Sequence, residues 1–264
     1  MITRLVSVAL ASLALHAAST RADLTVSAAI SLKGALEKAR PELEKSLGEK
    51  ITWNFGASGT LVGQIQQGAP VDLFISADRA TAQKLVAAHA GENASLTVVA
   101  GNALVLVVPK ANADLRISPR SFSDLPKVRK VAIGEPKAVP AGAYATEVLT
   151  RLKLWDELEK AGKLVTGENV AQVMALVQRG EVDAGVVYAT DARSAADKVT
   201  VVMTADPSMH SPIEYVSVIV SASKHKASAA KLQQALLAPA AQETMREFGF
   251  TAPAAPPAAT AAEK

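Results

Sequence analysis

Short apolar runs that alternate with helix-like segments constrain the fold of this chain more than any other feature of its sequence. Alternation of strands and helices is typical of α/β proteins with parallel sheets. The strands are expected at 24–28, 51–55, 73–76, 130–133 and 184–188, and the helices at 32–46, 60–67, 80–88, 143–152, 156–161 and 170–179. The sequence therefore predicts an α/β fold in which each strand leads into a helix.

Two further apolar runs, at 103–109 and 215–221, lie where a chain with two lobes would cross from one lobe to the other and back. A chain of 264 residues with 49% apolar residues is long enough to form two cores. Near the C-terminus, Pro239 is expected to separate two helices. We expect lobe 1 to comprise 23–102 and 213–250, lobe 2 to comprise 103–212, and 251–264 to be a disordered Ala/Pro tail.

A weak internal similarity relates the two expected lobes. Residues 67–78 (QGAPVDLFISAD) resemble residues 179–191 (RGEVDAGVVYATD) when one gap is allowed. The alternative is that any helix–glycine–strand–helix unit gives such a pattern, and the sequence alone does not separate the two possibilities.

The first 22 residues have the features of a cleaved signal peptide. Arg4 precedes an apolar run at 5–15, and small residues flank position 21. The run is too short for a permanent membrane span, and the chain has no cysteine that could carry a lipid anchor or form a disulfide. We therefore expect a mature protein in the periplasm, with no membrane anchor.

The charge balance argues against nucleic acid as a partner. The formal net charge is +3, but Arg4 and Arg21 belong to the expected signal peptide, which leaves 26 basic and 25 acidic residues. Only 4% of the residues are aromatic, so there are few rings on which bases could stack.

Residues typical of catalysis are scarce, and we expect a protein that is not an enzyme. The sequence contains no HExxH motif and no spaced Cys/His set, and His89, His210 and His225 lie in polar segments typical of the surface. Gly56–Thr60 partly resembles the nucleophile elbow of hydrolases, but Thr60 stands where that motif has glycine. An exported serine hydrolase with Ser58 as nucleophile, and His89 or His210 as base, is the least favoured alternative.

Hydrogen-bond donors are better represented. Ser31 and Ser58 each follow a predicted strand, and ligands of open α/β sheets bind beyond the carboxyl ends of the strands. Residues 56–60 and 139–145 each begin a helix without a charged residue, so their backbone N–H groups can bind an anion. Each serine alone could simply cap its helix, but the pair, flanked by Ala and Gly, favours a binding site.

Several motifs, taken in order, carry a resemblance to a known family. They are AAISL at 28–32, FGASGTL at 55–61, GAPVDLFISAD at 68–78, VPAGAYA at 139–145, ENV at 168–170 and GVVY at 185–188. The ordered set resembles the periplasmic molybdate-binding proteins of ABC transporters over nearly the whole mature chain. Residues 57 and 59 depart from the family pattern, and we expect these changes to small residues to affect only secondary contacts.

The resemblance implies a type II-like periplasmic binding protein whose two lobes, each a mainly parallel sheet flanked by helices, hold the ligand in the cleft between them. It also implies a monomer that binds molybdate, and tungstate as well, without a cofactor, and delivers it to a membrane permease. Tyr188 places the chain in the branch that binds a tetrahedral oxyanion by hydrogen bonds. The implied donors are the side chains of Ser31, Ser58 and Tyr188 and the backbone N–H groups of Ala141 and Val170.

The donor pattern agrees with this implication, because a tetrahedral dianion needs many donors and no acceptors. Protonated phosphate would need an acceptor and is disfavoured. Sulfate has the charge and shape of molybdate but shorter bonds, so a sulfate-binding protein of the same fold is the alternative that the sequence leaves open. Two of the implied donors also have a purely structural alternative, since Tyr188 could be a half-buried strand residue and Val170 a core residue at a helix start.

Overall fold

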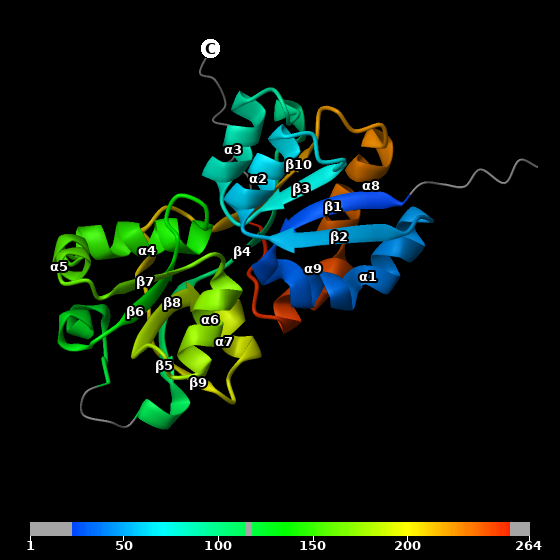
Figure 1. The fold of residues 1–264 in the computed structure, drawn as a ribbon. Helices are drawn as coiled ribbons and strands as arrows, with labels where there is room; N and C mark the ends of the chain where they lie inside the picture. The colour runs from blue at the N-terminus through cyan, green and yellow to red at the C-terminus, as the bar shows by residue number, and fades with distance from the viewer. Residues whose placement is uncertain (1–22, 114–117, 254–264) are drawn as a thin grey trace, which may run out of the picture.

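The computed structural model describes residues 23–113 and 118–253, which form two five-stranded sheets flanked by helices (Figure 1). The predicted signal peptide (1–22) and residues 254–264 of the predicted tail lie outside the described residues. The first sheet has the order β2-β1-β3-β10-β4 and the second the order β7-β6-β8-β5-β9. The two-lobed α/β fold predicted from the sequence is confirmed.

The first sheet is built from both ends of the chain. Its strands are β1 (Leu24–Ala29), β2 (Ile51–Gly56), β3 (Leu73–Ser76), β4 (Thr97–Gly101) and β10 (Glu214–Ile219). Its helices are α1 (Lys33–Leu47), α2 (Ser58–Gln66), α3 (Arg79–Ala87), α8 (Lys226–Leu237) and α9 (Pro239–Glu247). Helices α8 and α9, separated at Pro239 as predicted, pack against α1.

The second sheet is built from the middle of the chain. Its strands are β5 (Leu104–Pro109), β6 (Val131–Gly134), β7 (Leu164–Gly167), β8 (Ala184–Tyr188) and β9 (Val199–Thr204). Its helices are α4 (Pro140–Arg151), α5 (Trp155–Lys160), α6 (Val170–Gln178) and α7 (Ala189–Ser194). The sequence pattern did not predict β4, β7, β9 or α7. Edge strand β9 lacks a continuous apolar signal, since its Val201 and Met203 are 47% and 40% exposed.

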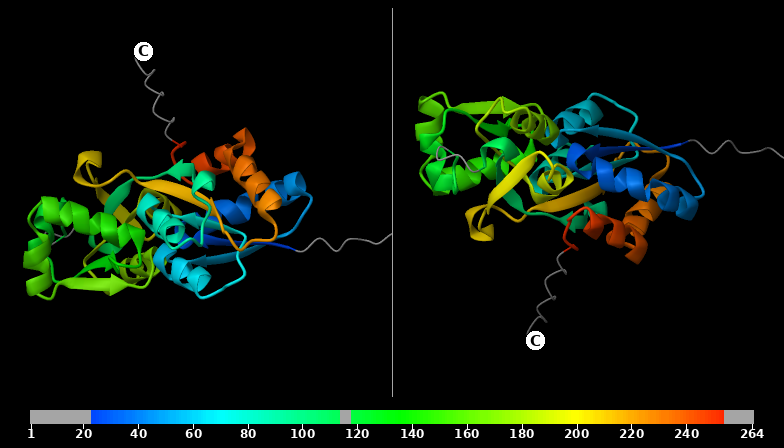
Figure 2. Two further views of the ribbon diagram at one scale, coloured as in Figure 1. Left: turned by 90° about the horizontal axis from the view of Figure 1, so that it is seen from above. Right: turned by 90° about the horizontal axis from the view of Figure 1, so that it is seen from below.

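The two predicted crossing strands are the reversed strands of the two sheets. Strand β5 is antiparallel to β8 and β9, and β10 is antiparallel to β3 and β4, whereas the other four strands of each sheet point the same way. Every residue of β5 is buried, which explains its uninterrupted apolar sequence. Both views in Figure 2 show the chain passing between the two lobes near these strands.

The internal similarity corresponds to matching local structure in the two lobes. Gly68 and Gly180 each end a helix with positive φ, of 92° and 68°. The carboxylate of Asp72 accepts the Thr25 N–H at 2.9 Å, and that of Asp183 accepts the Lys130 N–H at 2.9 Å. Each aspartate thus fixes its central strand to the start of the neighbouring strand in its own sheet.

The predicted tail boundary needs correction. We expected disorder from residue 251, but Thr251 pairs with Gly101 through two backbone hydrogen bonds of 2.8 and 3.0 Å. The chain is therefore fixed beside the end of β4 as far as this residue.

Candidate functional site

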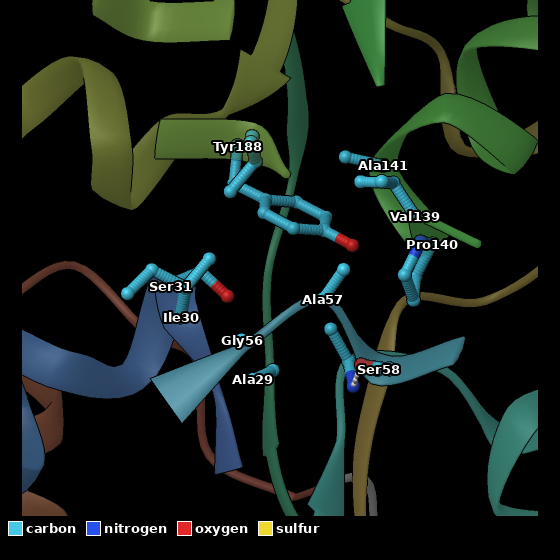
Figure 3. Close-up of a pocket in the computed structure, with 12 residues that line it drawn as sticks. Ala29, Ile30, Ser31, Gly56, Ala57, Ser58, Val139, Pro140, Ala141 and Tyr188 are labelled. Atoms are coloured by element: carbon cyan, nitrogen blue, oxygen red, sulfur yellow. Dashed lines mark hydrogen bonds between the residues drawn. The ribbon is translucent and has the colours of Figure 1, made fainter. Parts of the chain in front are cut away.

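A small cavity of about 10 Å³ lies between the two sheets, where strand ends and helix starts of both lobes meet (Figure 3). It is lined by Ala29, Ile30, Ser31, Gly56, Ala57, Ser58, Ala77, Val139, Pro140, Ala141, Val170 and Tyr188. The lining includes all five residues predicted for the site, and none of the lining residues is charged. An anion in this cavity would be held by neutral donors.

The first lobe contributes two serines that follow adjacent parallel strands. Ser31 lies in a 3-10 turn (Ile30–Leu32) directly after β1, and Ser58 is the first residue of α2 after β2. Because β1 and β2 are parallel and paired in register from Leu24 to Ala29, the segments that follow them emerge at the same sheet edge. Pairing of the two strands therefore brings the two serines to one cavity.

Neither serine caps its helix, so a capping role does not account for the pair. The N-cap positions are Ala29 and Ala57, and neither helix start has a side-chain cap hydrogen bond. The Ser58 Oγ instead accepts the Ala77 N–H at 3.1 Å, and the Ser31 Oγ lies 2.8 Å from the Tyr215 Oη.

The second lobe contributes Ala141 through the start of α4. The preceding Pro140 has no N–H, and the Gly142 N–H donates to the Val139 carbonyl at 2.9 Å. An N–H at the second position of a helix has no acceptor within its own helix, which leaves that of Ala141 available to a ligand. A Cβ on Gly142 would lie 2.1 Å from the Gly134 carbonyl oxygen, so glycine here allows α4 to start against the end of β6.

Val170 is the first residue of α6, and its N–H also has no acceptor within its helix. The cap residue, Asn169, is occupied with a different N–H, since its Oδ1 accepts the Gln172 N–H at 3.0 Å. The Val170 side chain is 2% exposed and part of the core. Val170 is thus both a core residue and a cavity residue.

Tyr188, at the end of β8, presents its hydroxyl to the cavity (Figure 3). The residue is 1% exposed, and within the described part of the chain its hydroxyl has no hydrogen-bond partner. Buried hydroxyl groups normally have a partner. Burial, together with the nearby Tyr215 and Tyr144, raises the pKa of Tyr188 well above its usual value, so the phenol stays protonated and can donate. The half-buried strand position considered from the sequence is therefore incorrect, because the side chain is fully buried at the cavity.

The two lobes touch directly beside this cavity. The Gly59 N–H of α2 donates to the Ala138 carbonyl at 2.9 Å, across the space between the sheets. A Cβ on Gly59 would lie 2.8 Å from both the Cα and the carbonyl oxygen of Ala138. Gly59 does not line the cavity, as expected for a residue in a secondary contact, but it makes a direct hydrogen bond between the lobes.

Three supporting residues were not predicted from the sequence: Tyr215, Asn102 and Ala77. The buried Tyr215 and the half-buried Asn102 form a hydrogen-bonded group behind Ser31, and Ala77 supplies the N–H that binds Ser58. Their partners lie 184, 113 and 19 residues away in the chain, so no local pattern could have indicated these pairs.

His89, His210 and His225 do not line the cavity. In the described residues, no histidine lines it, and Ser58 has no histidine partner. His210 was expected at the surface but is 8% exposed; its Nδ1 lies 2.8 Å from the Ser211 carbonyl oxygen, and its ring packs edge-on against Tyr144. No group of three or more His, Cys, Asp or Glu residues that could hold a metal ion occurs in residues 23–113 and 118–253.

Comparison with known proteins defines the family. Residues 24–251 match the family described as "Bacterial extracellular solute-binding protein". The chain belongs to this family. None of the helices that the structure describes is long and apolar enough to cross a membrane.

Individual solute-binding proteins resemble the chain over most of its length. A putative ABC transporter substrate-binding lipoprotein of Bacillus subtilis is 43% identical, covering 88% of this chain and 87% of that protein. The molybdate-binding protein ModA of Escherichia coli is 36% identical, covering 89% and 91%. Among solved structures, the periplasmic molybdate-binding protein of Azotobacter vinelandii superposes with a TM-score of 0.77 at 27% identity, covering 88% of this chain and all of that one.

Proposed function

We propose that this solute-binding protein captures molybdate in the interlobe cavity and delivers it to the membrane permease of an ABC transporter. The observation that supports this function best is the buried Tyr188 hydroxyl, which has no partner among the described residues. It faces an uncharged cavity lined by two serines and by the starts of two helices of the second lobe. A tetrahedral dianion supplies the acceptors that these donors lack. The names of the curated relatives point to the same ligand.

The proposal extends to tungstate, which has the same charge and shape as molybdate. The proposed function involves no cofactor and no catalytic step. The Ser58 Oγ accepts the Ala77 N–H, which suits a binding role. We place the mature protein in the periplasm as a monomer, after removal of residues 1–22. Sheet membership supports lobe 1 as 23–102 plus 213–250 and lobe 2 as 103–212.

Thermal shift of the purified mature protein with molybdate, tungstate, sulfate and phosphate tests this function. Molybdate and tungstate are expected to raise the melting temperature, because a ligand at one hundred times its Kd adds about 2.7 kcal/mol to the free energy of unfolding. Sulfate and phosphate should have little effect at the same concentration. A larger shift with sulfate would replace molybdate with sulfate as the ligand, and no shift with any oxyanion would end the proposal.

A further inference from the structure

The amide of Asn102, between β4 and β5, has a fixed orientation. Its Oδ1 accepts the Ala103 N–H at 2.9 Å, and a backbone N–H can only donate. The Nδ2 therefore faces the other two partners, the Thr190 Oγ1 at 2.9 Å and the Tyr215 Oη at 3.2 Å. Asn102 is thus a hydrogen-bond donor to Tyr215.

This orientation decides the direction of the next hydrogen bond. Tyr215 is fully buried, and the structure gives its hydroxyl two partners, Asn102 and Ser31. Since Asn102 donates to it, the single phenol hydrogen is left for the Ser31 Oγ at 2.8 Å. The opposite direction would leave a buried hydroxyl hydrogen without an acceptor, which is costly.

The same arrangement holds at the other serine. The Ser58 Oγ accepts the Ala77 N–H, so its own hydrogen is free to point elsewhere. Both serine oxygens that line the cavity therefore accept a hydrogen bond from the protein, and both hydroxyl hydrogens remain for the cavity. This pattern suits a ligand that carries acceptors and no proton.

We propose that Tyr215 is a positioning residue that sets Ser31 as a donor to the bound oxyanion and thereby disfavours protonated oxyanions. The inference rests on the proposed oxyanion function and deepens it. Tyr215 does not line the cavity, and it acts through Ser31. Asn102 supports it by occupying the acceptor side of the phenol.

The test is Tyr215→Phe, measured by calorimetry with molybdate and with arsenate, a tetrahedral oxyanion that keeps a proton near neutral pH. Loss of the orienting bond should weaken molybdate binding by about three- to tenfold. Arsenate binding should weaken less or improve, because Ser31 can then accept its proton. The ratio of molybdate affinity to arsenate affinity is therefore expected to fall. A general disruption of the site would weaken both affinities equally and leave this ratio unchanged.

Ser31→Ala gives a second readout through a double-mutant cycle. In that background Tyr215→Phe should have no further effect on molybdate affinity. Tyr144→Phe is the matched control: Tyr144 is 4% exposed, is not among the lining residues, and donates to the Pro212 carbonyl at 3.2 Å. The effect of Tyr144→Phe on affinity should be small and equal for molybdate and arsenate. It should also be additive with the effect of Ser31→Ala.

The phenylalanine ring retains the packing of Tyr215 against Phe250 and Tyr188, at centroid distances of 5.2 and 5.9 Å. Should Tyr215→Phe still not fold, Asn102→Ala provides the same test. We expect a smaller loss of molybdate affinity and again a smaller preference for molybdate over arsenate. Unchanged molybdate affinity, equal losses for both oxyanions, or additivity with Ser31→Ala would each overturn the inference. If the unaltered protein binds no molybdate, it is the proposed function that fails.

Discussion

Tyr188 shows how one buried group can favour ligand binding at the residue scale. Its hydroxyl is unpartnered in the described structure, whereas the two cavity serines each have a protein partner. A bound oxyanion would supply an acceptor for this buried donor, and hydrogen bonds to charged groups are the stronger ones. Tyr188 is therefore expected to favour the ligand-bound form.

Tyr188→Phe is expected to weaken molybdate binding by about 1.5 to 3 kcal/mol, the range for hydrogen bonds to charged groups. The ligand-free variant should keep its thermal stability, because the substitution removes no hydrogen bond between described protein groups. Calorimetry and melting without ligand measure the two effects. Ala141→Gly is the control: it keeps the backbone N–H, so its affinity should be nearly unchanged. Full affinity in Tyr188→Phe would remove this residue from the site.

At the element scale, the start of α2 both lines the cavity and contacts the other lobe. Its first residue, Ser58, lines the cavity, while the next, Gly59, binds Ala138 of the other lobe. The cavity residue Ser58 and the residue that contacts the other lobe, Gly59, are therefore neighbours at the start of one helix. Closure of the two lobes around a ligand is a hinge motion, which small contacts of this kind can bias.

Gly59→Ala is expected to hold the lobes apart, because its Cβ would meet the Ala138 backbone at 2.8 Å. Molybdate affinity should fall by more than about tenfold, although residue 59 does not line the cavity. Small-angle scattering should show compaction with molybdate in the unaltered protein and not in the variant. Gly63→Ala, in the same helix with nothing within 4 Å of its Cβ, should bind and close normally. Normal closure of Gly59→Ala would contradict this role.

At the scale of the whole molecule, Asp191 links the binding region to global stability. Burial raises the pKa of its carboxyl to about 7, partly offset by the hydrogen bond from the Tyr188 N–H at 3.3 Å. Since the unfolded pKa is about 3.9, the folded protein holds a proton that the unfolded chain releases between these values. Stability should therefore fall as pH rises from about 4 to about 7.

Asp191→Asn is expected to remove this part of the pH dependence and to be more stable than the unaltered protein above neutral pH. The asparagine oxygen can still accept the Tyr188 N–H, so local structure is retained. Urea unfolding at mildly acidic and mildly alkaline pH measures the difference. Asp197→Asn, at an exposed position, should keep the original profile. Parallel profiles for Asp191→Asn and the unaltered protein would contradict this role of the half-buried Asp191 carboxyl.

Particular residues show how far the sequence leads. Strands such as 73–76 and the Asp78 cap of α3, whose Oδ1 accepts the Thr81 N–H at 2.8 Å, follow from local propensity and capping chemistry. Ser31 and Ser58 were identifiable because each directly follows an apolar strand. Strand β9 and the burial of His210 were not identifiable, because edge position and tertiary packing decided them.

The sequence by itself determined the alternation of strands and helices, the two crossing strands and the five proposed donor residues that line the cavity. All of these depend on local patterns and on residues next to them in the chain. Only the tertiary structure decided which way the Ser31 hydroxyl points and why residue 59 is glycine. Both depend on groups distant in sequence, Tyr215 on β10 and Ala138 before α4. Hydrogen-bond direction and close backbone approach are fixed by the positions of such partners in space, and no local pattern encodes them.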